Sequence, residues 1–245
     1  MRLSIEAVCH KGLVRENNED ALAVGGLFLR DGQVKPITLT TSDDGFFYLL
    51  VADGMGGHEN GEEASQFALD EIREQLSFHQ IQPDSFEDDV LEAARYISYK
   101  LNSAAAARDQ ALPMGCTLSG VIWHYGRTWL VNAGDSRTYR FRDGMLRQLT
   151  TDETERGITG DPEASKLLLN CLGGGADGRL AVEDLEGKLL EGDQLLICSD
   201  GLCDMVSDEE IEAALAGGAK VDDLFRMACE AGGVDNISII LATIL

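Results

Sequence analysis

Two tight turns between strand-like runs constrain this chain more than any other feature of its sequence. Asp143-Gly144 separates TYRFR from MLRQL, and Tyr125-Gly126 separates VIWH from RTWLV. Asp-Gly between two such runs is a strong β-hairpin signal, and strands joined by so short a turn must be antiparallel. Further strand-like runs are LSIEAVC, FFYLLVA, QLLICS and NISIILATI. The sequence therefore predicts antiparallel sheets.

Helices are predicted between these runs. Apolar residues recur on one face over 61–78 and over 85–107, as in amphipathic helices. Ser207 with Glu210 forms a capping-box signature for a helix over 208–216, and a further helix starts at Asp222. Helices grouped between antiparallel strands are typical of an α+β layered domain, with sheets covered by helices. Because the last strand-like run continues to Leu245, we expect a single domain over residues 1–245.

The charge of the chain argues against two classes of partner. Its net charge is −23 and its pI about 4.3, and an acidic surface repels phosphate backbones and anionic lipids. We therefore expect no nucleic acid and no membrane among its partners. Most of this charge fits a solvated acidic surface, but clustered carboxylates that hold cations are also compatible with it.

Cysteine usage and apolar runs bear on the cellular compartment. The six cysteines lie mostly within apolar runs, and none forms a Cys-x-x-Cys pair, which favours reduced, buried thiols over disulfides or a zinc site. No apolar run reaches the roughly 20 residues that span a bilayer, and the first residues contain no segment of signal-peptide length. The expected location is the cytoplasm.

Acidic residues recur where apolar strands stop. Asp53 follows FFYLLVA, Asp135 follows TWLVNAG, Asp200 follows QLLICS, Asp235 precedes NISIILATI, and Asp20 precedes ALAV. Carboxylates brought close together repel one another and lose hydration, so their clustering makes sense if a cation lies among them. Carboxylate, carbonyl and water ligands select hard cations such as Mg²⁺ and Mn²⁺.

Glycines beside these aspartates have two readings. A single Asp-Gly after a strand is usually only a turn, and we interpret Asp31-Gly32 and Asp143-Gly144 in that way. At Gly54, the missing side chain would also let the backbone carbonyl approach a metal ion. The recurrence of aspartates with small neighbours at several strand ends favours a metal site.

Six motifs, in order over nearly the whole chain, resemble those of the metal-dependent type-2C protein phosphatases (PPM family), in the bacterial serine/threonine branch. They are 15-RENNED-20, 51-VADGMGGHENGEEAS-65, 115-GCTLSGV-121, 131-VNAGDSRTYRFRDG-144, 199-SDGL-202 and 234-VDNISII-240. The resemblance implies a central β-sandwich of two antiparallel sheets flanked by helices, a four-layer α-β-β-α arrangement. It also implies a dinuclear Mn²⁺ or Mg²⁺ site at one edge of the sandwich.

The resemblance also implies roles for individual residues. Asp53 would bridge both metal ions, Gly54 would give its backbone carbonyl to one of them, and Asp200 and Asp235 would bind the other. Asp20 would hold metal-bound water, and Asp135 would bind a third, weaker metal ion. Arg15 would grip the substrate phosphate, since a guanidinium fork matches phosphate oxygens.

The implied reaction is direct hydrolysis of phosphoserine or phosphothreonine by a metal-activated water, without a phosphoenzyme. His58 is the candidate general acid for the leaving oxygen, because imidazole titrates near neutral pH. It could equally position the substrate or cap the start of the helix. The resemblance further implies phosphoprotein substrates, a serine/threonine kinase whose action the enzyme opposes, and a monomer.

Two segments depart from the pattern of the bacterial branch. Residues 26–45 form an apparent extra hairpin or loop, and the segment 152–171, where relatives carry a flap over the active site, is short. Both would contact the polypeptide around the phosphate, so they affect substrate preference. Two alternatives therefore stay open: a phosphatase of a small phosphorylated metabolite, and a module that binds phosphoproteins without turnover.

Overall fold

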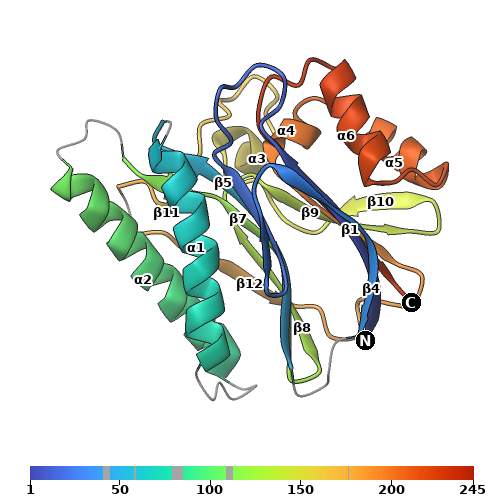
Figure 1. The fold of residues 1–245 in the computed structure, drawn as a ribbon, viewed down its shortest axis with the longest axis horizontal. Coiled ribbons are helices and arrows are strands. Elements are labelled where there is room, and N and C mark those ends of the chain that lie inside the picture. The colour runs from blue at the N-terminus through green and yellow to red at the C-terminus, as the bar shows by residue number, and fades with distance from the viewer. Residues whose placement is uncertain (41–44, 58, 79–84, 109–112, 176) are drawn as a thin grey trace.

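The computed structural model describes residues 1–40, 45–57, 59–78, 85–108, 113–175 and 177–245. These residues form two antiparallel sheets that pack face to face, with helices on both outer sides (Figure 1). The predicted α+β sandwich with four α-β-β-α layers is confirmed.

The first sheet has six strands, and their order across the sheet is β10 (Met145–Gln148), β9 (Arg137–Arg142), β13 (Gln194–Cys198), β14 (Ile237–Ile244), β1 (Arg2–His10) and β4 (Gly32–Thr40). The main path of the second sheet is β11 (Leu172–Gly173), β6 (Gly115–Cys116), β5 (Phe46–Met55), β7 (Leu118–His124), β8 (Arg127–Ala133) and β12 (Ala181–Asp184). Beside this path, β2 (Asp20–Val24) pairs with β5, and β3 (Leu27–Leu29) pairs with β2.

Both predicted hairpins are confirmed. Tyr125 and Gly126 connect β7 to β8 with φ angles of 46° and 75°, and Asp143 and Gly144 connect β9 to β10 with 51° and 80°. Two central residues with positive φ are what a type I′ turn requires, and this turn matches the twist of the flanking strands.

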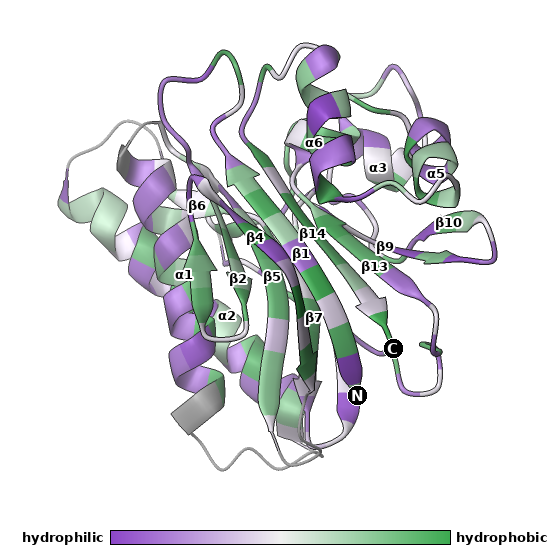
Figure 2. Cartoon of the chain, turned by 45° about the vertical axis from the view of Figure 1, so that its right-hand side comes forward, coloured by the Kyte–Doolittle hydropathy of each residue, from purple (hydrophilic) through white to green (hydrophobic). Residues whose placement is uncertain are grey.

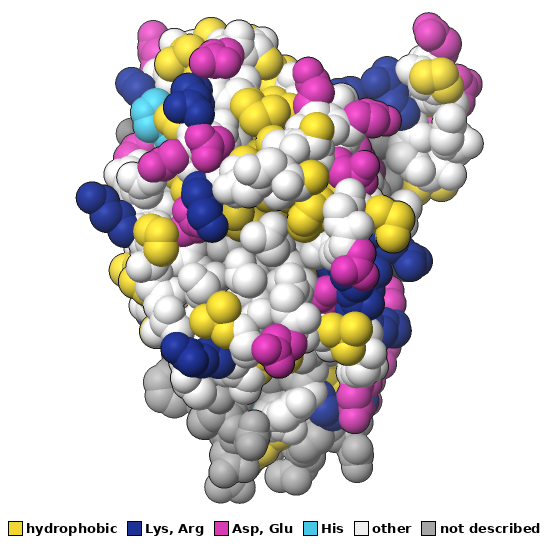
Figure 3. Space-filling view, turned by 90° about the vertical axis from the view of Figure 1, so that its right-hand side faces the viewer, with side chains coloured by type: hydrophobic (Ala, Val, Ile, Leu, Met, Phe, Trp, Pro, Cys, Tyr) yellow, Lys and Arg dark blue, Asp and Glu magenta, His cyan; other side chains and the backbone are white. Residues whose placement is uncertain are grey.

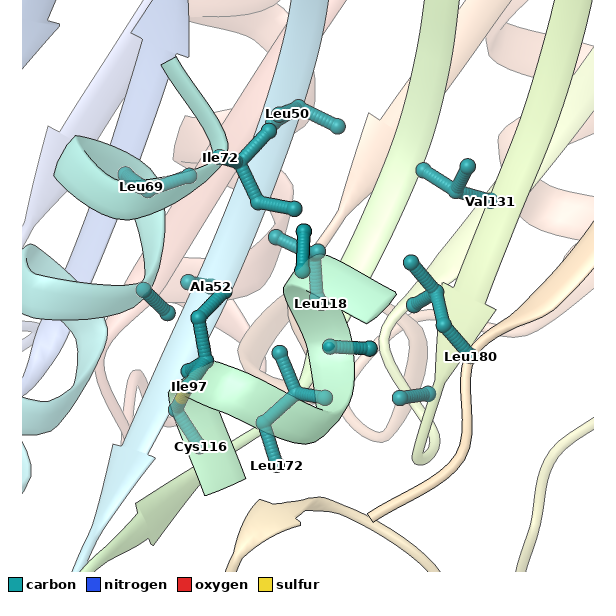
Figure 4. Close-up of a cluster of buried hydrophobic side chains, with 14 of the residues drawn as sticks. Leu50, Ala52, Leu69, Ile72, Ile97, Cys116, Leu118, Val131, Leu172 and Leu180 are labelled. Carbon is teal, nitrogen blue, oxygen red and sulfur yellow. The ribbon is translucent and has the colours of Figure 1, made fainter. Parts of the chain in front are cut away.

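Strand β5 explains why the run FFYLLVA is apolar throughout rather than alternating. Successive side chains of a strand point to opposite faces of the sheet. Leu49 and Val51 lie in the layer between the two sheets, whereas Tyr48, Leu50 and Ala52 pack beneath the helices. Both faces of this strand are buried, as Figure 4 shows for the helix-covered side.

The long helices form where the apolar periodicity predicts them. α1 (Glu59–Phe78) and α2 (Phe86–Ala107) cover the second sheet and turn hydrophilic faces outward (Figure 2). Ile72 of α1 and Ile97 of α2 are fully buried in the cluster that these helices form with the sheet (Figure 4). None of the helices in the described ranges is long and apolar enough to cross a membrane.

The other face of the sandwich carries the shorter helices α4 (Asp200–Cys203), α5 (Asp208–Ala216) and α6 (Val221–Glu230). The capping box of Ser207 and Glu210 is present at the start of α5, as predicted. Helix α6 begins at Val221, one residue before the predicted start. On the face shown in Figure 3, acidic and basic side chains are interspersed rather than gathered by sign.

The segment 26–45 differs from the predicted extra hairpin or loop. Its strands β3 and β4 do not pair with each other: β3 pairs with β2 in the second sheet, and β4 pairs with β1 at the edge of the first. The chain therefore crosses from one sheet to the other at Arg30-Asp31. Part of the segment, 41–44, lies outside the described residues.

Candidate metal centre

Asp20 and Asp53 are brought together by strand pairing. Asp20 opens β2 and is the register partner of Asp53 in β5. Leu22 lies two residues after Asp20 and Val51 two residues before Asp53, and both point into the layer between the sheets. Because side chains alternate along a strand, the two aspartates occupy the same inner face. Asp20 directly follows loop 11–19, which lies in the upper part of Figure 1 together with α4.

Asp200 and Asp235 reach this end from the first sheet. Asp200 opens α4 directly after β13, and Asp235 lies two residues before β14, the neighbour of β13. Ser199 donates a hydrogen bond of 2.7 Å from its hydroxyl to Oδ2 of Asp20. This bond links the strand ends of the two sheets, so residues far apart in sequence meet at one edge.

The carboxylates at this edge of the sandwich raise one another's pKa values. Burial raises the pKa of Asp53 well above its usual value, and Asp20, Asp200, Asp235 and Asp135 raise it further. Burial, followed by the charges of Asp135, Asp235 and Asp20, raises the pKa of Asp200 to about 8. A carboxylate in such surroundings loses hydration and is repelled by its neighbours, and a bound cation would relieve both effects.

Asp20 is fully buried. Burial raises its pKa to about 7, against the opposing effect of hydrogen bonds from Ser199 and Ser238. Its Oδ1 atom and Oδ1 of Asp200 are buried and have no hydrogen-bond partner among the described residues. Buried oxygens without donors are costly, and an oxygen-only donor set suits Mg²⁺ or Mn²⁺, so these residues fit the implied ions.

The side chains nevertheless do not form a finished ligand set on their own. Across the described ranges, no group of three or more His, Cys, Asp and Glu side chains is arranged so that it could hold a metal ion. The carboxylates lie at one edge of the sandwich and influence one another electrostatically. Their assignment as metal ligands remains a prediction.

Arg15 lies at the rim of this cluster. Its Nη2 donates a hydrogen bond of 2.7 Å to Oδ2 of Asp235, and its side chain is 54% exposed. Asp235 also accepts a 2.8 Å hydrogen bond from the backbone N–H of Asn236. An exposed guanidinium beside partly buried carboxylates is suitably placed to meet an anion that approaches from solvent.

Gly54 has a structural reason to lack a side chain. A Cβ at this position would lie 1.9 Å from the carbonyl oxygen of Gly61 and 2.6 Å from that of Glu19. The end of β5 therefore touches the first turn of α1 backbone to backbone. This contact accounts for the glycine without any metal ion, and it holds Asp53 close to the start of the helix.

Asp135 lies beside the cluster, after β8. Burial, and then the charge of Asp152, raises its pKa to about 6. Asp135 and Asp200, together with Lys166 of the short 152–171 segment, line a cavity of about 510 Å³. Arg137 binds the Asp152 carboxylate through both Nε and Nη2 and so fixes the wall between Asp135 and this segment.

His58, the predicted general acid, lies outside the described residues, so its role stays a prediction. Three supporting residues were not singled out from the sequence. Thr117 accepts a hydrogen bond of 3.0 Å from the backbone N–H of Asp53, and Ser199 binds Asp20. Asn236 accepts from the N–H of Glu19 at 2.7 Å. All three lie inside the six motifs quoted above, and their place in these motifs is the one sequence signal that could have identified them.

Comparison with known proteins identifies the family of the chain. The family model of protein phosphatase 2C matches residues 37–242. The chain is 32% identical over 254 residues to the serine/threonine protein phosphatase PstP of Mycobacterium tuberculosis, with 96% of this chain aligned. That alignment spans 44% of the length of PstP.

A second relative is covered almost completely. The serine/threonine phosphatase stp of Listeria monocytogenes is 31% identical over 253 residues, which make up 94% of this chain and 92% of stp. A crystal structure of the catalytic domain of PstP, in complex with two manganese ions, superposes with a TM-score of 0.75 and 30% identity. The superposition covers 98% of both chains. This chain belongs to the protein phosphatase 2C family.

Proposed function

We propose that residues 1–245 form a single catalytic domain that hydrolyses phosphoserine and phosphothreonine in proteins with the help of divalent metal ions. The observation that carries the proposal is the meeting of Asp20, Asp53, Asp200 and Asp235 from both sheets, with Arg15 at their rim. Bound cations would stabilise buried carboxylate oxygens that have no hydrogen-bond donors. An exposed arginine beside these oxygens suits a phosphate.

The ions in the proposal are two Mn²⁺ or Mg²⁺, with a third, weaker site at Asp135. The structure of the PstP catalytic domain in complex with two manganese ions supports the first two ions of this proposal. When bound, such ions activate a water molecule and stabilise charge on the phosphoryl oxygens. Asp53 would contact both ions, with the carbonyl of Gly54 on one, and Asp200 and Asp235 on the other. Asp20 would orient water, and the hydroxyl of Ser199 holds the Asp20 carboxylate in place.

The chain's own groups would bind and orient the substrate. Arg15 would exchange part of its contact with Asp235 for the phosphate, since both anions accept from the same guanidinium. His58 would donate a proton to the leaving serine or threonine oxygen. In the cell, we propose a cytoplasmic monomer whose substrates are phosphoproteins and which opposes a serine/threonine kinase.

The direct test is phosphate release from phosphothreonine peptides and from p-nitrophenyl phosphate with Mn²⁺, before and after chelation by EDTA. We expect turnover that EDTA stops and added Mn²⁺ restores. Asp200→Asn should lose most of the metal-dependent turnover and stay folded. Asp143→Asn, an exposed turn residue, is the matched control and should keep it. Turnover that survives chelation would contradict the metal-dependent mechanism.

Two alternatives have outcomes of their own in this test. A metabolite phosphatase is the better description if kcat/KM on a panel of small phosphate esters exceeds that on phosphopeptides. A binding module without turnover is the better description if phosphopeptides bind and no phosphate is released at any metal concentration.

A further inference from the structure

The crossing between the sheets at Arg30-Asp31 contacts the loop that carries Arg15 and Asp20. Asn18, two residues before Asp20, is 3% exposed and lies against this crossing. The Nη1 atom of Arg30 donates a 2.7 Å hydrogen bond to the carbonyl oxygen of Asn18. Oδ1 of Asp31 accepts a 3.1 Å hydrogen bond from the side-chain amide of the same residue.

Arg30 is built into its place rather than resting on the surface. Its side chain is 17% exposed. Its Nη2 atom donates to the carbonyl oxygen of Glu62 at 2.8 Å and to the hydroxyl of Ser65 at 3.2 Å, both in α1. Ser65 in turn donates to the carbonyl oxygen of Glu19 at 2.6 Å. The guanidinium of Arg30 therefore links α1 to the backbone carbonyl of Asn18 directly and to that of Glu19 through Ser65.

Asp31 holds its position through an uncommon backbone conformation. Its φ is 51°, in the left-handed region, which aspartate and asparagine tolerate better than most other residues. Asn18, which Asp31 binds, accepts a 3.2 Å hydrogen bond from the backbone N–H of Asp20 through its own Oδ1. The contact chain thus runs from Asp31 through one buried side chain to the backbone of Asp20.

The same loop is held on its opposite side by Asn236. This residue donates to the carbonyl oxygens of Asn17 and Lys11 at 2.9 Å and 3.0 Å. Asn236 adjoins Asp235, so one side of the loop is tied to that predicted ligand. Without the crossing, Asn18 would lose the two hydrogen bonds that it makes with Arg30 and Asp31, whereas the bond from Ser65 of α1 to Glu19 would remain.

We propose that Arg30 and Asp31 are positioning residues that clamp Asn18 and thereby fix Asp20 and Arg15 for metal and phosphate binding. They come from the 26–45 segment, in which this chain departs from the family pattern. The segment therefore acts on the site itself and not only on substrate preference. The inference rests on the proposed function, because it concerns the same site.

The experiment measures Mn²⁺ binding to the whole chain by isothermal titration calorimetry, alongside the Mn²⁺ dependence of phosphate release. Arg30→Met keeps the aliphatic stem and removes the donors. We expect its Kd for Mn²⁺ and its half-saturating Mn²⁺ concentration to rise about tenfold, as for losses of groups that orient metal ligands. At saturating Mn²⁺, kcat should return to within about threefold of the wild-type value.

A matched control separates positioning from general stability. Arg73 also contacts the 26–45 segment, because its guanidinium lies 4.9 Å from the ring centroid of Phe28, but it lies on the exposed side of α1. Arg73→Met should leave Mn²⁺ affinity within about twofold. The pair Asp31→Ala and Asp31→Asn provides a rescue test: asparagine keeps the acceptor oxygen and tolerates the backbone conformation, so it should restore affinity that alanine loses.

The outcomes distinguish this inference from the proposed function. If the wild-type chain releases no phosphate with Mn²⁺, the proposed function fails, whereas Mn²⁺ affinity still reports on the clamp. If the wild-type chain is active and Arg30→Met binds Mn²⁺ with unchanged affinity, the clamp is overturned. Equal loss in the Arg30 and Arg73 variants, or in both Asp31 variants, would also overturn it. If Arg30→Met does not fold, the Asp31 pair decides.

Discussion

Replacing Asp200 with asparagine should stabilise the metal-free protein and remove the stabilisation that a divalent cation provides. Asp200 opens α4, and the charges of Asp135, Asp235, Asp20 and Asp204 act on its side chain. One of its carboxylate oxygens is buried without a hydrogen-bond partner among the described residues. Without metal, its negative charge opposes folding. With metal, the same charge would attract the cation.

The magnitude follows from the pKa of this group. Burial, and then Asp135, Asp235 and Asp20, raises the pKa of Asp200 from 3.8 to about 8. Because the folded-state pKa exceeds the unfolded one, protonation stabilises the fold; this stability is fully present below about pH 4 and is lost as the pH rises to about 8. Each pKa unit is about 1.4 kcal/mol, so about 4 kcal/mol of this stability is lost by pH 7.

The asparagine amide still loses hydration in this buried position, so the expected net gain is about 2 kcal/mol. For a chain of this length, such a gain raises Tm by about 4 to 8 °C. The assay is thermal unfolding in EDTA, at pH values around 5 and around 8, near the two ends of the range over which this stability is lost. The advantage of Asp200→Asn over the wild type should be larger at the higher pH.

The second half of the assay adds Mn²⁺. A ligand at 100 times its Kd stabilises the native state by about 2.7 kcal/mol, so the Tm of the wild type should rise and that of Asp200→Asn should change little. Asp143→Asn removes the same charge from a turn that suits asparagine, and it should follow the wild type in both conditions. The reasoning is refuted if Asp200→Asn lowers Tm in EDTA at pH 8, or if Mn²⁺ stabilises it as much as the wild type.

Three further outcomes are expected. Arg15→Ala should raise KM for phosphopeptides about tenfold with little change in kcat, because it removes a phosphate contact; steady-state kinetics showing an unchanged KM would count against that role. Gly54→Ala should cost more than about 3 kcal/mol in urea unfolding, because its Cβ would lie 1.9 Å from the carbonyl oxygen of Gly61. Gly26→Ala, in open space, should cost less than about 1 kcal/mol, and equal losses would contradict the packing argument. Ser199→Ala should cost about 1 to 3 kcal/mol in the same assay, since Oδ2 of Asp20 loses its donor; unchanged stability would speak against that bond.

Much of the fold could be predicted from local patterns. The Asp143-Gly144 turn needs only local backbone preference and twist, and α1 and α2 form where one face repeats at helical spacing. The crossing at Arg30-Asp31 could not be read in this way. Strands β3 and β4 are adjacent in sequence and look like a hairpin, but each finds its partner in a different sheet, and sequence proximity does not select a partner.

The candidate site also has features that the sequence predicts and features that it does not. Asp53, Asp200 and Asp235 could be selected because each stands at the end of an apolar strand within a recognisable motif. Their common location depends on register, since Asp20 meets Asp53 only through the pairing of β2 with β5. The structure also explains the glycine at position 54 by its close contact with Gly61 rather than by a metal ion. This contact joins two segments whose approach no local sequence pattern encodes.

The sequence by itself determined the chemical character of the site: hard carboxylate oxygens at strand ends, with an arginine nearby. It did so because residue types and strand periodicity are local properties. Only the tertiary structure decided which groups support these residues, namely Ser199 beneath Asp20 and Arg30 beside Asn18. The first contact joins the two sheets and the second joins the crossing to the loop before β2, so tertiary packing, rather than any run of the chain, sets their distances.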